Sequence, residues 1–162
     1  MTQYATILNM LQRVYSLPNN YMSLAPYILL ALTFIGIADT VYLSYFAYYN
    51  AVPGCAIGGC ETVLTSEYSK FLGVPLAYIG LVYYVYMIAL AFLLALDPKS
   101  KILALAGVGY TAVGVLLSLY FEFYIQGVLI GEYCMYCAIS AVVSGALFAA
   151  ALWHFKSLSK AK

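Results

Sequence analysis

Four long apolar segments restrict what this chain can fold into more than any other feature. They cover residues 24–47, 71–96, 102–125 and 134–155. Their only acidic or basic side chains are Asp39, Glu122 and, at the end of the fourth segment, His154. At about 1.5 Å of rise per residue, each segment crosses the roughly 30 Å hydrocarbon core of a bilayer as a helix. Helices are expected because backbone groups in lipid must hydrogen-bond within their own segment.

The composition agrees with a membrane location. The chain is 65% hydrophobic and 8% charged, with a formal net charge of +1, whereas soluble domains carry about 25% charged residues. Period-2 alternation, which is typical of membrane β-barrels, is absent, and no basic run suggests a nucleic-acid partner. We therefore predict an all-α membrane protein, a four-transmembrane-helix bundle forming a single domain over residues 1–162. Residues 4–15 have the spacing of a short interfacial helix, with a frayed tail as the equal alternative.

The positive charges predict how the bundle is oriented in a cell membrane. Four spans place both termini on one side, and the segment before residue 24 lacks a signal-peptide cleavage pattern. Six of the seven basic residues fall on the side of the termini: Arg13, Lys99, Lys101, Lys156, Lys160 and Lys162. Lys70 alone falls on the other side. The positive-inside rule then puts both termini and the 97–101 turn in the cytoplasm. The connections 48–74 and 126–133 are expected on the extracytoplasmic face.

All four cysteines of the chain fall on that predicted extracytoplasmic face. Cys55 and Cys60 lie in the first connection, and Cys134 and Cys137 form a C-x-x-C pair that opens the last span. Extracytoplasmic compartments permit disulfides. The free N–H groups and positive dipole at a helix start stabilise a cysteine thiolate, which is the species that attacks disulfides. The cysteine placement therefore indicates redox chemistry at this face.

The first connection is expected to form a lid over the bundle. Glycines and a proline surround Cys55 and Cys60 and predict a turn-rich loop. Residues 61–70 are predicted to form a short capping helix. Ser66 within it is expected to orient that helix or hydrogen-bond a sulfur, unless it is an ordinary surface serine.

The loop allows two pairings, Cys55 with Cys60 or Cys60 with Cys134, and thiol–disulfide exchange needs such a mobile partner. The far side of the bundle offers no cysteine, and one histidine cannot supply a bis-histidine haem. A membrane quinone beside Cys137 therefore fits best as the terminal electron acceptor. The alternatives are zinc binding by the four thiolates and two static disulfides in a membrane scaffold without turnover. We favour the catalytic relay and expect no metal.

Two acidic side chains within the spans and the many tyrosines have open interpretations. A charged residue at mid-membrane is costly, roughly 2.5–3.5 kcal/mol on insertion scales. Asp39 and Glu122 are therefore expected either to cap a buried polar contact, which we prefer, or to shuttle protons. The chain holds 18 tyrosines, many near the predicted outer ends of the helices. These are expected to form an interfacial aromatic belt or, in part, to line a flat pocket beneath the lid.

The order of these motifs resembles the vitamin K epoxide reductase family. Cys55-x4-Cys60, Ser66, the Gly73-Val-Pro75 helix start and Cys134-x-x-Cys137 occur in the family's order, over about residues 24–155. The resemblance implies that Cys137 meets the quinone and that Cys134 is its disulfide partner. It also implies that Cys60 exchanges with Cys134, Cys55 exchanges with a partner protein, and Ser66 lies near the quinone.

The resemblance implies a quinone-dependent thiol–disulfide oxidoreductase that supports disulfide formation, with menaquinone, ubiquinone or a similar quinone as acceptor. The sequence departs from animal members in lacking an asparagine within residues 71–96 and in having Ala141 where they place a tyrosine. The hydrogen-bond donors to the ring are therefore not assigned by resemblance. No thioredoxin-like domain follows the last span, so a separate thioredoxin-like partner is expected. The alternative functions are vitamin K epoxide or quinone reduction by the same relay, and the stapled scaffold.

Overall fold

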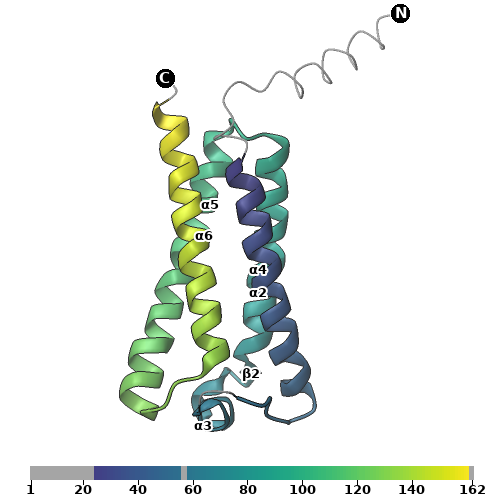
Figure 1. Cartoon of the computed structure of the whole chain (residues 1–162), viewed down its shortest axis with the longest axis vertical. Helices are drawn as coiled ribbons and strands as arrows, with labels where there is room; N and C mark the ends of the chain where they lie inside the picture. The colour runs from purple at the N-terminus through teal and green to yellow at the C-terminus, as the bar shows by residue number, and fades with distance from the viewer. Residues whose placement is uncertain (1–23, 56–57, 161–162) are drawn as a thin grey trace, which may run out of the picture.

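A computed structural model describes residues 24–55 and 58–160, and the expected interfacial helix at residues 4–15 lies outside them. Four long helical rods run side by side (Figure 1). They are α2 (Leu24–Tyr48), α4 (Leu76–Leu96), α5 (Lys101–Leu119) continued by the π-helix η2 (Tyr120–Ile130), and α6 (Met135–Lys160). All four rods are long and apolar enough to cross a membrane. The predicted four-helix membrane bundle is therefore confirmed.

Three boundaries differ by about five residues from the predicted ones, and one of them is the end of α6, which lies at Lys160 rather than at residue 155. The second span begins at Leu76 rather than residue 71, because β1 (Lys70–Phe71) and β2 (Val74–Pro75) form a small antiparallel hairpin before it. Leu72 and Gly73 at its tip have positive φ values of 51° and 84°, which no helix accepts. The third rod runs on to Ile130 instead of ending at residue 125.

The helices pack through small residues and a common apolar core. α2 packs against α4 and α6, and α5 packs against α6. Leu29, Met87 and Leu147 are fully buried in this core. Gly36 lies so close to the ring of Tyr84 that any added Cβ would overlap it. Small residues thus allow the close helix approach that membrane bundles use in place of hydrophobic association.

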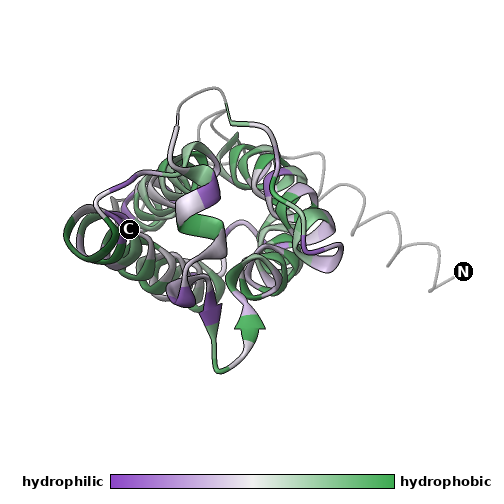
Figure 2. Ribbon diagram, turned by 90° about the horizontal axis from the view of Figure 1, so that it is seen from below, coloured by the Kyte–Doolittle hydropathy of each residue, from purple (hydrophilic) through white to green (hydrophobic). Residues whose placement is uncertain are grey.

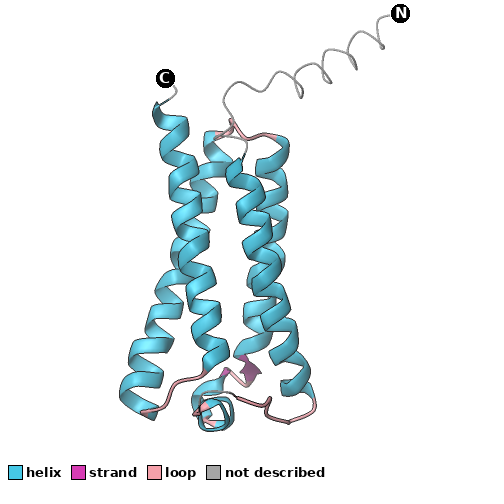
Figure 3. Cartoon of the chain, in the orientation of Figure 1, coloured by secondary structure: helices cyan, strands magenta, loops and turns pink. Residues whose placement is uncertain are grey.

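The start of α2 and the end of α6 lie at one end of the bundle, and the connection between α2 and α4 closes the other (Figures 1 and 3). That connection holds α3 (Cys60–Thr65) and the 3-10 turn η1 (Glu67–Ser69). Viewed from this end, α3 lies across the ring of helix ends, and much of the hydrophilic colour gathers on it and the neighbouring loops (Figure 2). We call residues 49–75 the lid. Its capping helix is shorter than the predicted 61–70 because the chain turns at Ser66, which has an extended backbone.

Candidate active site

The four cysteines meet beneath the lid, although the two pairs lie far apart in the sequence. Cys60 and Cys134 are both 0% exposed and form one apolar cluster with Val63. Cys55 and Cys137 are partly buried and pack against the same cluster. The fold therefore brings together the two pairs that the sequence analysis placed on one face.

The two pairs differ in how they are bonded. Cys55 and Cys60 are joined by a disulfide, with their Cα atoms 6.0 Å apart. Cys134 and Cys137 are free thiols. Within residues 24–55 and 58–160, no group of three or more His, Cys, Asp or Glu side chains is arranged to hold a metal ion. A disulfide packed against a dithiol is the arrangement from which thiol–disulfide exchange proceeds.

The lid loop is held against the bundle next to each cysteine of its disulfide. Gly59 has a φ of +92°, and a Cβ there would lie 2.7 Å from the carbonyl oxygen of Tyr133 and 2.9 Å from Glu132 Oε2. The hydroxyl of Tyr136 on α6 donates a 2.8 Å hydrogen bond to the carbonyl of Gly54. Glycine at position 59 is thus required both by its backbone conformation and by the close approach that seats Cys60 against α6.

Cys134 caps the start of α6 and is held by a chain of side-chain hydrogen bonds. Its carbonyl accepts the N–H of Ala138 at 3.0 Å. Its own N–H donates to Gln126 Oε1 at 2.7 Å, and Gln126 Nε2 donates to Glu122 Oε1 at 2.9 Å. Gln126 is 2% exposed. The π-helix η2 thus supplies the groups that position the first cysteine of the C-x-x-C pair.

Replacing Gln126 with leucine is expected to destabilise the protein by about 1–3 kcal/mol. Leucine has a similar volume but leaves the buried Cys134 N–H without an acceptor, and an unpaired buried donor costs about this much. Thermal unfolding of the purified protein in detergent measures the effect. Glu122→Gln is the matched control, because its amide oxygen still accepts from Gln126 Nε2. Equal stability of the Gln126→Leu and wild-type proteins would contradict this role.

Cys134, which precedes the membrane span Met135–Ser159, is prepared as a nucleophile. A hydrogen bond from the Cys137 thiol lowers the pKa of Cys134 to about 7, assisted by the backbone N–H groups of Cys137 and Tyr136. Burial and the negative charge of Glu122 oppose this shift. The thiolate of Cys134 is therefore the main form above about pH 7 and is lost as the pH falls through that value.

This dependence on Cys137 can be measured in a background in which Cys55 and Cys60 are both serine. Thiolate ultraviolet absorbance then titrates Cys134 alone once Cys137 is also replaced. Cys137→Ser keeps a hydroxyl donor, so the midpoint is expected near pH 7. Cys137→Ala removes the donor, and the midpoint should rise by about 1–2 pH units, since a hydrogen bond to a charged group contributes about 1.5–3 kcal/mol. Identical midpoints in the two variants would exclude this cause.

A cavity of about 480 Å³ lies beneath the lid, between the helices. Its wall includes Cys137, whereas Cys134 belongs to the buried cluster with Cys60 and Val63. Val63, Leu64 and Ser66 contribute from the lid side. A mostly apolar cavity of this size is typical of sites for small organic molecules. The second cysteine of the C-x-x-C pair thus adjoins a space that suits a lipid-soluble ring.

Polar groups in the cavity wall have unused hydrogen-bonding capacity. Asp39 Oδ2 and the Tyr83 hydroxyl are buried and have no hydrogen-bond partner within the described part of the chain. The Tyr84 hydroxyl lies 3.0 Å from Ser140 Oγ and 3.5 Å from Ser144 Oγ. These two serines are conspicuous in the sequence only as small packing residues, yet both line the cavity. The unpaired groups fit a ligand that carries oxygen atoms, as a quinone does.

Several sequence expectations can be placed against this geometry. The Ser66 hydroxyl donates to the Val63 carbonyl at 2.7 Å, so it closes the end of α3. Ser66 also lines the cavity, and its contact with a quinone stays a prediction.

The two acidic side chains within the spans differ. Glu122 makes the buried polar contact that we preferred for both acids, here with Gln126, whereas Asp39 Oδ2 makes none. The tyrosines of the cavity wall are Tyr68, Tyr83 and Tyr84.

Tyrosines near the helix ends form exposed ring pairs, and their place in an aromatic belt at the membrane interface stays a prediction. The rings of Tyr45 and Tyr49 are 4.9 Å apart, and those of Tyr120 and Tyr124 are 5.4 Å apart. All four of these side chains are exposed.

The role of Gln126 at Cys134 is not predicted from the sequence. Its only signal there is a polar amide four residues after Glu122, at the end of an apolar run.

Comparison with known proteins places these features in a family. The sequence model of the vitamin K epoxide reductase family matches residues 27–152. The thiol-disulfide oxidoreductase LTO1 of Arabidopsis thaliana is 36% identical over 119 residues, which are 68% of this chain and 31% of that protein. The chain thus corresponds to about a third of the length of this relative.

Proposed function

Because this chain belongs to the vitamin K epoxide reductase family, we propose that it is a quinone-dependent thiol–disulfide oxidoreductase of the membrane. Electrons enter from a thioredoxin-like protein, pass from Cys55 and Cys60 to Cys134 and Cys137, and leave to a membrane quinone. One observation carries this proposal. The lid disulfide and the free dithiol share one buried cluster, and Cys137 of the dithiol lines the cavity below.

In the first exchange, a thiolate of the partner attacks Cys55, which is the more accessible sulfur of the lid disulfide. The partner's second thiol then resolves the mixed disulfide, so the partner leaves oxidised and the lid holds two thiols. Two electrons and two protons have entered the protein in this step. Thiol–disulfide exchange through a mixed disulfide requires no other reagent.

In the second exchange, the Cys60 thiolate attacks Cys134 of a Cys134–Cys137 disulfide and frees Cys137. Cys55 then attacks Cys60, which restores the lid disulfide and leaves Cys134 and Cys137 reduced. An oxidised lid over a reduced helix pair is also the pairing described above. Because Cys60 and Cys134 are buried in the same cluster, this transfer needs only a local movement of the lid.

The last step returns the helix pair to its disulfide. When Cys134 and Cys137 form a disulfide, two electrons and two protons are released. A bound quinone would accept them. Cys137, Ser66 and the cavity residues of α2 and α4 would hold the ring. Two electrons leave as one new S–S bond forms, so the overall reaction converts one dithiol partner and one quinone into a disulfide and a quinol.

The proposed orientation places the lid on the extracytoplasmic side of the membrane. Lys99 and Lys101 lie at or beside the short α4–α5 turn, opposite the lid. The positive-inside rule therefore supports a cytoplasmic position for the turn and an extracytoplasmic position for the lid. The partner would be a thioredoxin-like protein of that compartment, and the reaction would support disulfide formation there.

The direct test is reduction of a short-chain quinone by the purified protein supplied with a reduced thioredoxin-like protein. We expect one partner disulfide per quinol formed. A protein that leaves the quinone unreduced, with both cysteine pairs resistant to mild dithiols, would instead be the stapled scaffold. Product analysis with a vitamin K epoxide substrate tests the second activity suggested by the family name.

A further inference from the structure

We propose that Asp39 transfers a proton to the ring oxygen of the quinone that occupies the cavity, which makes it a catalytic residue on α2. This inference rests on the proposed function and adds to it the route of one of the two protons. It also decides between the two interpretations of the acidic residues within the spans, because Asp39 and Glu122 differ in their surroundings.

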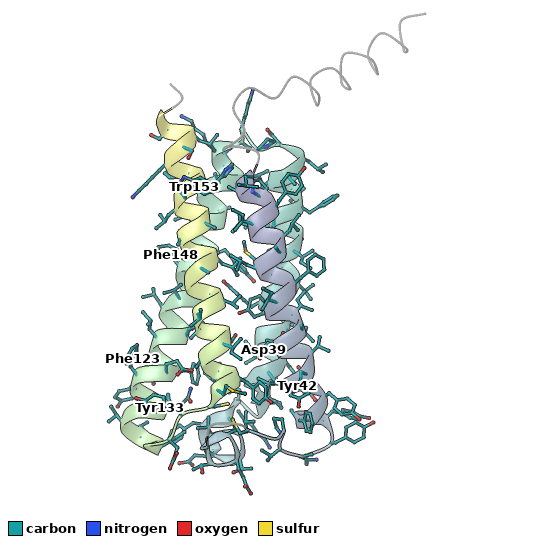
Figure 4. All side chains as sticks on the ribbon, in the orientation of Figure 1. Asp39, Tyr42, Phe123, Tyr133, Phe148 and Trp153 are labelled. Carbon is teal, nitrogen blue, oxygen red and sulfur yellow. A yellow bond between two sulfur atoms is a disulfide. The ribbon has the colours of Figure 1, made fainter. Side chains whose placement is uncertain are left out.

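The position of Asp39 favours this role. Its side chain lines the same cavity as Cys137. Its Oδ2 atom is buried and has no hydrogen-bond partner within residues 24–55 and 58–160. Figure 4 shows Asp39 on α2 at a level between the lid end and the middle of the bundle, farther from the lid than Tyr42. The carboxyl group and the Cys137 sulfur belong to residues that line one cavity, which therefore holds both a redox sulfur and a proton-carrying group.

The other polar groups of the cavity are less suited to this transfer. Glu122 Oε1 already accepts from Gln126 and holds Cys134 in place. The Tyr84 hydroxyl is engaged with Ser140. The Tyr83 hydroxyl is unpaired, but a phenol holds its proton far more tightly than a carboxylic acid. A buried carboxyl oxygen without a partner is costly, and a hydrogen bond from a ligand or a proton would remove that cost.

The proton transfer balances with the thiol chemistry. As the Cys134–Cys137 disulfide forms, two electrons leave the sulfurs for the quinone. Asp39 accepts the proton of the Cys137 thiol and passes a proton to one ring oxygen, so its own charge is unchanged over the cycle. The other ring oxygen takes its proton from water, which balances the proton that Cys134 releases on becoming a thiolate. General acid–base groups placed in this way contribute about 10²–10⁴-fold to a rate.

The test compares Asp39→Asn, Asp39→Glu and the control Asp97→Asn, which makes the same chemical change at the opposite end of the bundle. We expect Asp39→Asn to slow quinone reduction by about 10²-fold or more, Asp39→Glu to restore part of the rate, and Asp97→Asn to match wild type. Exchange between the lid disulfide and the helix dithiol, followed without quinone, should be unchanged in all three. A loss below about tenfold, or an equal loss of exchange, would overturn the proposal.

A second measurement does not depend on turnover. In a Cys137→Ala background, addition of a short-chain quinone should shift an infrared carboxyl band that disappears when Asp39 is also replaced by asparagine. Quinone binding without any such shift would overturn the role of Asp39. If wild type reduces no quinone at all, the proposed function fails instead, and the two failures are thereby distinguished.

Discussion

A Cys137→Ala protein is expected to reduce no quinone above background while it still exchanges disulfides with its protein partner. Cys137 is the cysteine in the cavity wall, so its removal leaves no helix disulfide that could form or pass electrons to the quinone, whereas the lid disulfide stays open to the partner. Cys134 can then pair with Cys60 but cannot be released by Cys137, and a Cys60–Cys134 disulfide should accumulate. Quinone absorbance measures the loss of turnover, and peptide mapping under non-reducing conditions identifies the trapped bond.

Ile139→Ala is the matched control for this experiment. Ile139 lies on the same helix two residues later and is 39% exposed, so its truncation changes α6 without touching a thiol. Turnover of that variant should stay near the wild-type rate. Undiminished quinone reduction by Cys137→Ala would exclude the assigned role of Cys137, and absence of the Cys60–Cys134 bond would contradict the exchange that precedes it.

A Cys60→Ser protein is expected to pass no electrons from its thioredoxin-like partner to the helix pair, because Cys55 is then a free thiol and the lid offers no disulfide for the partner to reduce. Cys60 is the buried half of the lid pair, and without it no sulfur carries electrons from the lid to Cys134. Partner-driven quinone reduction should fall to background, and an oxidised Cys134–Cys137 pair should stay oxidised when reduced partner is added. Gel shifts after alkylation report the oxidation state of Cys55 and that of the Cys134–Cys137 pair.

Thr62→Ala controls for damage to the lid in that comparison. Thr62 is exposed on the same short helix α3 and is not a thiol, so this variant should turn over normally. Reduction of the helix pair by the partner in Cys60→Ser, at the wild-type rate, would show that the lid does not mediate the transfer. The partner would then have to reach Cys134 directly.

The bundle and the gathering of cysteines were predictable because each rests on a strong local signal. Hydrocarbon thickness sets the length of the apolar runs. The connections 48–74 and 126–133 lie on one face because two spans separate them along the chain. The start of α4 at Leu76 was not predictable in the same way. The Lys70–Pro75 hairpin is apolar at most positions, and hydropathy alone does not distinguish it from helix.

The polar details of the site depend on contacts that no sequence pattern records. Gln126 bonds to the backbone of Cys134 because the η2 segment is π-helical and the chain reverses at Gly131, whose φ is +77°. A π-helical segment of this kind is rare, and an α-helical register would point Gln126 elsewhere. For the same reason Asp39 and Glu122 read alike in the sequence, and only their neighbours in space separate them.

The burial of Cys60 and Cys134 has a consequence for how the protein coexists with other thiols. Only Cys55 of the lid pair is open to the surroundings, and Cys137 adjoins the interior cavity. Reductants of the size of glutathione thus have no direct contact with the sulfurs of Cys60 and Cys134. A quinol in the cavity would likewise have no direct contact with the partner protein. In the proposed relay the two half-reactions therefore take place at separate sites, which limits futile cycling between the two substrate pools.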